Sequence, residues 1–265
     1  MDEPSKIEAI YRYPVKGLSA ERLESTRLRA GETIPADRLY AIENGPSGFD
    51  PAAPACLPKQ RFLMLMRNER LARLKARFDA ASHVLAIELE GATVACGDLR
   101  TRTGRASIES FLADFCADEL RGPPRVLHAN GHSFSDVARK VVSIINLASV
   151  AQIENAVGAP VDPLRFRGNL YVSGWPAWHE FSLVGREMRI GTAATVKVVK
   201  RIQRCAATEV DPLTAARDLP IPRMLLQTFG HADCGIYAEV VGDGEIAEGD
   251  AVADDGRPRT GDGRE

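Results

Sequence analysis

The sequence lacks several features that would assign it to a specialised class. No apolar run approaches the ~20 residues that a membrane-spanning helix needs. The N-terminal segment MDEPSKIEAI is acidic and has no basic-then-apolar run, so we expect no signal peptide. The net charge is −2, which predicts no general attraction to nucleic acid or acidic membranes. We therefore expect a cytoplasmic protein that contacts neither nucleic acid nor membrane.

Cysteine is scarce and irregularly spaced. The five cysteines are an odd number without a C-x-x-C pair: Cys56, Cys96, Cys116, Cys205 and Cys234. This argues against a disulfide framework and a structural zinc site, and the plant-type iron–sulfur spacing is missing too. The sequence also has no phosphate-binding Gly-rich loop, HExxH or G-x-S-x-G motif and no dinucleotide fingerprint.

What is present is typical of a β-rich globular protein. Hydrophobic residues make up 45% and charged residues 26% of the 265 positions. Strand-like segments lie within residues 7–13, 37–44, 83–98, 164–174, 195–203 and 235–241. Many short strands with few helices predict an α+β, mainly β fold, built from two barrel-like β domains with attached helices.

Two segments have helical periodicity. Residues 107–120 are expected to form a helix with Ser107 as its cap and Gly122 as its stop, and Cys116 joins the buried stripe. Residues 140–160 predict a strand that runs into a helix, which Asn146 caps and Gly158 ends. The Gly- and Pro-rich residues 45–58 predict a long surface loop.

The segment GHSFSD suggests a division of the chain between these two helices. We expect an N-terminal β-barrel domain at residues 1–130 and a second domain at residues 131–254. The last eleven residues, 255–265, are polar and rich in glycine, and they predict a disordered tail.

Cys205 is the first candidate for chemistry. It lies in RIQRCAATEVDP (residues 201–212), just past a predicted strand and beside Arg204, with Lys200 and Arg201 close by. Cationic neighbours favour the thiolate form, which ligates soft metals or attacks electrophiles. The residues alone also allow a buried cysteine at a strand end.

Basic residues recur at the ends of predicted strands. If they converge, they form a pocket for a phosphate-bearing ligand, because guanidinium groups match phosphate oxygens. If they do not, they are separate solvated charges. The residues are Lys16, Arg38, Arg139, Lys140, Arg165, Arg167 and Arg204.

Several motifs together resemble a known family. YPVKG (13–17) and ADRLYAI (36–42) resemble the N-terminal β-barrel domain that precedes MOSC domains. The MOSC domain itself is resembled by FSDVARKVVSIINLASV, FRGNLYV, RCAATEVDP and CGIYAEVVGDGEIAEGD, which begin at residues 134, 166, 204 and 234. Two-domain proteins of this type include the mitochondrial amidoxime-reducing component. The resemblance extends from about Ile7 to Val252.

The resemblance implies a molybdenum cofactor, that is, molybdenum held by the dithiolene of a phosphate-bearing pterin (molybdopterin). It implies that Cys205 is the molybdenum ligand and the catalytic residue. The implied cofactor contacts are Lys16, Gly17, Arg38, Arg139, Lys140, Arg167, Asn169, Arg204 and Tyr237. Two positions depart from the mitochondrial relatives, which have serine at Gly17 and a small hydroxyl residue at Gln203.

The activity implied is reduction of N-hydroxylated or N-oxide compounds, independent of pyridoxal phosphate. Electrons would come from a separate reductase or ferredoxin-like partner, because the sequence shows no motif for another redox cofactor. Two alternatives remain open. One is a sulfur carrier with a persulfide on Cys205, as the resemblance to molybdenum cofactor sulfurases permits, and the other is a non-enzymatic module that binds the cofactor.

Overall fold

The computed structural model describes residues 4–254 and confirms the mainly β, α+β prediction. The α helices are α1 (Arg102–Phe115), α2 (Leu147–Val157) and α3 (Ile221–Phe229). The strands are β1 (Lys6–Arg12), β2 (Glu21–Leu23), β3 (Ser25–Leu28), β4 (Ala41–Asn44), β5 (Lys75–Phe78), β6 (Val84–Leu89), β7 (Ala92–Asp98), β8 (Pro124–Leu127), β9 (Val142–Asn146), β10 (Leu170–Ser173), β11 (Glu187–Ile190), β12 (Ala194–Gln203), β13 (Asp233–Gly242), β14 (Gly244–Ala247) and β15 (Val252–Asp254). The predicted tail, residues 255–265, lies outside the described residues.

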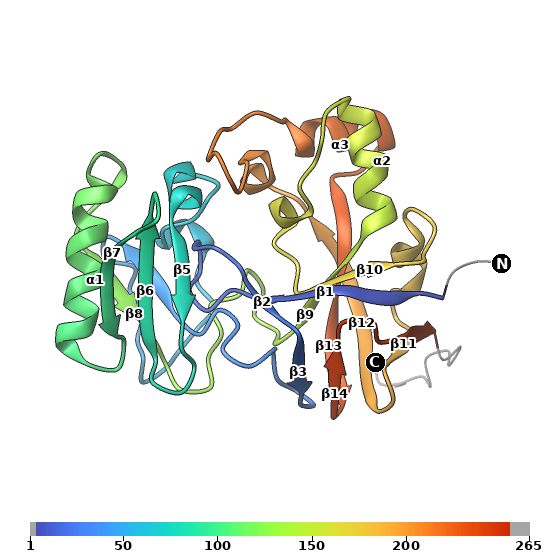
Figure 1. Ribbon diagram of the computed structural model, residues 1–265, viewed down its shortest axis with the longest axis horizontal. Coiled ribbons are helices and arrows are strands. Elements are labelled where there is room, and N and C mark those ends of the chain that lie inside the picture. The colour runs from blue at the N-terminus through green and yellow to red at the C-terminus, as the bar shows by residue number, and fades with distance from the viewer. Residues whose placement is uncertain (1–3, 255–265) are drawn as a thin grey trace, which may run out of the picture.

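One large sheet forms the lobe drawn on the right of Figure 1. Its eight strands follow the order β15-β11-β12-β13-β9-β10-β1-β2, and only the β9–β10 pair is parallel. Its apolar core takes side chains from β1 as well as from the C-terminal strands, for example Ile10, Ile144 and Val198. Strands β1 and β2 are therefore part of the same sheet as strands beyond residue 140. Between them, the chain forms the second lobe and then comes back to the large sheet.

The second lobe contains the β5-β6-β7 sheet, the β4–β8 pair and α1 (Figure 1). Its core includes Leu71, Ile87 and Leu112. The strand-like segment at residues 83–98 forms the antiparallel pair of β6 and β7, with Gly91 between the two strands. Helix α1 begins earlier than predicted, because the Thr101 side chain, not Ser107, accepts a hydrogen bond from the Gly104 amide at 2.9 Å.

Helices α2 and α3 lie side by side above the large sheet (Figure 1). The prediction for α2 is confirmed: the Asn146 side chain accepts a hydrogen bond from the Ala148 amide, and Gly158 ends the helix with a left-handed backbone. Helix α3 was not predicted. It packs Ile221 and Leu225 into a core that it shares with α2. None of the helices in residues 4–254 is both long and apolar enough to cross a bilayer.

Candidate functional site

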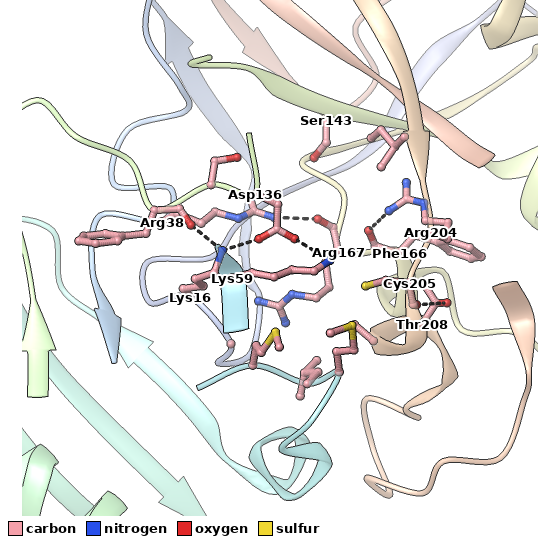
Figure 2. Close-up of a pocket in the computed structure, with 18 of the residues that line it drawn as sticks. Lys16, Arg38, Lys59, Asp136, Ser143, Phe166, Arg167, Arg204, Cys205 and Thr208 are labelled. Carbon is pink, nitrogen blue, oxygen red and sulfur yellow. Dashed lines mark hydrogen bonds and ion pairs between the residues drawn. The ribbon is translucent and has the colours of Figure 1, made fainter. Parts of the chain in front are cut away.

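A pocket lies where the two lobes meet, with about 950 Å³ of space that includes open solvent. Segments from both lobes line it, namely residues 16–17, 37–38, 64–66, 134–136, 165–167, 202–205 and 207–208, together with residues such as Lys59, Ser143, Asn169 and Tyr237. Figure 2 shows Lys16, Lys59 and Arg167 grouped around Asp136, with the Cys205 sulfur on the opposite side of the same hollow.

Most of the residues implied by the family resemblance lie in this pocket. They are Lys16, Gly17, Arg38, Arg167, Asn169, Arg204, Cys205 and Tyr237. They come from segments far apart in the sequence, and the fold brings them together in one pocket.

Arg139 and Lys140 do not line this pocket, so convergence, one of the two alternatives for the basic residues, does not extend to these two. Arg139 pairs with Glu239 at 3.0 Å, and its side chain is 69% exposed. Lys140 pairs with Glu32 at 2.6 Å. The chain bends at residues 136–139. Residues 134–136 line the pocket, while these two long side chains reach surface carboxylates.

Lys16 and Asp136 form the centre of the cationic part. The buried Lys16 ammonium group donates to the Asp136 carboxylate and, at 2.8 Å, to the Phe134 carbonyl oxygen. Burial lowers the pKa of Lys16 despite this carboxylate. Burial would raise the pKa of Asp136, but Lys16, Lys59 and Arg38 together lower it to about 2. Asp136 is therefore an ionised counterion inside a cluster of cations.

Arg38 and Arg167 share one aromatic support. Their guanidinium carbons lie 4.4 and 4.3 Å from the centroid of the Tyr13 ring. Both residues have a left-handed backbone, with φ of 50° and 49°. Residues other than glycine rarely adopt this conformation. Burial lowers the pKa of Arg167, and the Arg38 positive charge adds to this effect. Such strain tends to occur where a side chain must be held in one direction.

Lys59 is a pocket residue that the sequence did not reveal. Its ammonium group lies 3.6 Å from the Asp136 carboxylate and interacts with the Cys205 sulfur. Partial burial opposes its charge, but Asp136 and Cys205 raise the pKa of Lys59. It directly follows the Gly- and Pro-rich loop at residues 45–58, where no periodic pattern marks a buried or converging side chain.

Cys205 lies two residues past the end of β12 and directly precedes a 3₁₀ helix, Ala206–Glu209. Its carbonyl oxygen accepts hydrogen bonds from the amide and the hydroxyl group of Thr208, each at 3.0 Å. The thiol lines the pocket and is partly exposed, so the core-cysteine alternative does not hold for this residue. Cys116 and Cys234 are the buried thiols, and burial raises their pKa to about 11 and about 12.

Two other predicted contacts support the pocket walls. Arg204 donates to the Cys234 carbonyl at 2.7 Å and to the Phe166 carbonyl at 2.8 Å. The Asn169 side chain accepts from the Ser143 amide and hydroxyl and donates to the Tyr11 carbonyl at 3.0 Å. These groups are bonded to the protein, so they position the Cys205 loop and strand β9.

Gly17 is required by a close backbone approach. It has φ of 87°, and a Cβ at this position would lie 2.6 Å from the Leu63 carbonyl oxygen. A serine at this position would have to displace that backbone.

The side chains of the pocket suit a metal that is bound mainly by a cofactor and not by the protein. Within residues 4–254, no group of three or more His, Cys, Asp or Glu side chains could hold a metal ion. One thiol and several cations instead suit a bound group that carries both an anion and a metal.

Family models match the chain in two consecutive parts. Residues 5–119 match the MOSC N-terminal beta barrel domain, and residues 128–253 match the MOSC domain. The chain is a MOSC domain protein. MOSC domains are known for binding the molybdenum cofactor. The two matched regions are separated by residues 120–127, and β1 and β2 from the first region pair within the large sheet.

Two solved structures are similar to this MOSC protein. The YuaD protein from Bacillus subtilis is 14% identical with a TM-score of 0.45, over 94% of each chain. YiiM from Geobacillus stearothermophilus is 21% identical with a TM-score of 0.33, over 42% of this chain and 52% of its own. At these TM-scores neither likeness bears on function. Among the curated proteins, none matches this chain.

Proposed function

We propose that this protein binds the molybdenum cofactor in the pocket and reduces N-hydroxylated or N-oxide compounds, with Cys205 as the metal ligand. One observation carries the proposal: a partly exposed thiol lines the same pocket as the buried Lys16 and the partly buried Arg38 and Arg167. This arrangement suits a ligand with a metal at one end and an anionic group at the other.

In this proposal Lys16, Arg38 and Arg167 hold the anionic part of the cofactor and Cys205 holds the metal. When bound, the cofactor supplies the chemistry that removes oxygen from an N–OH group. Each such reduction converts the N–OH group to N–H and water, and consumes two electrons and two protons.

Other residues in and beside the pocket prepare the site. Tyr13 fixes the two guanidinium groups, Thr208 holds the backbone that carries Cys205, and Lys59 places a positive charge beside the sulfur. The apolar side chains of Met64, Leu65 and Met66 line the same pocket and offer a surface for the body of a substrate. We expect a separate reductase or ferredoxin-like protein to supply the electrons.

The test begins with protein made in a host that synthesises the cofactor. Elemental analysis and cofactor extraction should find molybdenum and molybdopterin. With an artificial low-potential donor, the loaded protein should reduce an amidoxime or an N-hydroxylated base. NADH alone should not support the reaction.

The remaining outcomes separate the alternatives. Bound molybdenum without reduction of any N-oxygenated compound would favour a cofactor-binding module. A protein without molybdenum whose Cys205 persulfide transfers sulfur to an acceptor would be a sulfur carrier.

A further inference from the structure

Arg217 connects two walls of the pocket. One wall is residues 64–66 from the N-terminal half. The other belongs to the segment that begins at Cys205, of which Cys205, Ala207 and Thr208 line the pocket. Arg217 lies on the loop that follows Cys205. It is not among the pocket-lining residues, and its side chain is 32% exposed. It therefore joins the walls from their outer side.

The Arg217 guanidinium group bonds to both walls at once. One nitrogen donates to the Ala206 carbonyl at 2.8 Å and to the Glu209 carboxylate at 3.1 Å. The other donates to the Leu65 and Met66 carbonyls at 3.3 and 3.2 Å and to the Glu69 carboxylate at 3.1 Å. The planar fork of arginine makes this division possible, since its two ends point to different partners.

Ion pairs to the buried Arg165 hold the loop that carries Arg217 in place. The neighbouring residue Asp218 forms a two-pronged pair with the buried Arg165, at 2.8 and 2.9 Å, and Arg165 also binds Asp211 at 2.9 Å. Arg165 anchors the loop to the large-sheet lobe, so the bonds from Arg217 to residues 65, 66 and 69 restrain the other lobe.

We propose that Arg217 is a strap that limits the size of the molecules that reach Cys205. With the strap in place, the wall of residues 64–66 stays against the Cys205 loop. Without it, the two walls have fewer bonds between them and can separate. If the proposed reductase activity holds, Arg217 is a specificity-determining residue that favours compact N-hydroxylated substrates. The accessibility of the thiol does not depend on that activity.

The experiment measures alkylation of Cys205 in the full chain purified without cofactor, by iodoacetamide and by a bulky fluorescein maleimide. Peptide mass spectrometry reads Cys205 separately from the exposed Cys56 and Cys96, which serve as internal standards. Arg217→Ala should raise the ratio of the bulky to the small reagent's rate at Cys205 by about tenfold, because several charge-assisted hydrogen bonds are lost. The ratio for Arg217→Lys should lie between those of the wild type and Arg217→Ala, since an ammonium group cannot span both walls.

Arg223→Ala is the matched control, because it removes an exposed arginine from α3 and should leave the ratio unchanged. An unchanged ratio in Arg217→Ala would overturn the proposal. So would an equal rise for both reagents accompanied by labelling of the buried Cys116 and Cys234, which would indicate general unfolding.

The substrate arm uses the loaded enzyme. Arg217→Ala should lower KM for a bulky N-hydroxylated compound while KM for a small one changes little. If no N-oxygenated compound is reduced, the proposed function fails but the labelling ratio still decides whether Arg217 is a strap.

Discussion

Arg38 donates a hydrogen bond of 2.9 Å to the carbonyl oxygen of Arg167, although 129 positions separate them in the chain. Their guanidinium groups also contact the same Tyr13 ring. The two cations thus form one unit with the first strand-end motif, YPVKG. In the proposed function, this unit receives the anionic part of the cofactor.

The aromatic ring of Tyr13, and not its hydroxyl group, should contribute to anion binding in the pocket. Tyr13→Leu removes both cation–π contacts, each worth about 0.5–1 kcal/mol, and should weaken binding of inorganic pyrophosphate to the cofactor-free protein by about tenfold. Tyr13→Phe keeps the ring and should bind almost as the wild type does. Isothermal titration calorimetry measures both. Equal affinities for the leucine and phenylalanine variants would contradict the role of the ring.

Asp136 should make the stability of the protein depend on pH in the acid range. Its pKa is about 2 in the folded protein against an ordinary value of 3.8, so its stabilising effect is complete above the ordinary value and is lost as the pH falls toward 2. Between about pH 5 and about pH 3, wild type should therefore lose more free energy of unfolding than Asp136→Asn. Urea unfolding at both pH values tests this, and equal losses would show that Asp136 has no such effect.

Gly17→Ala should destabilise the fold by about 1–3 kcal/mol, because the added Cβ meets the Leu63 carbonyl and the backbone is left-handed. Gly158→Ala is the control. Gly158 has φ of 68°, but a Cβ there meets nothing within 4 Å. Thermal unfolding should show the larger loss for Gly17→Ala, and the reverse order would refute the close-approach argument.

Cys234→Ala should affect activity far less than Cys205→Ala. The Cys234 thiol is buried with a pKa of about 12, and Arg204 bonds to its backbone oxygen, which the substitution retains. Reductase assays of the two variants, normalised to molybdenum content, provide the comparison. Similar losses in both would contradict the assignment of chemistry to Cys205 alone.

The sequence predicted features that depend on local chemistry. Asn146 and Gly158 delimit α2 as expected, since a cap and a left-handed glycine act within a few residues. The start of α1 was missed because Thr101 and Ser107 are both acceptable caps, and packing of the first turn against β7 decides between them.

The site depends on contacts between distant segments, which local patterns do not determine. Motifs that resemble the family identified Lys16, Arg167 and Cys205, and the structure brings them to one pocket. Lys59 carries no such motif and was missed. Arg139 lies in a motif, yet a bend in the backbone turns it toward Glu239 at the surface.

The most direct test of the account is X-ray absorption at the molybdenum edge, comparing wild type with Cys205→Ala, both loaded in a cofactor-competent host. We expect the variant to fold, to retain the cofactor's own sulfur ligands and to lose one sulfur scatterer together with its activity. An unchanged sulfur count with full activity would contradict the assignment of Cys205 as the molybdenum ligand.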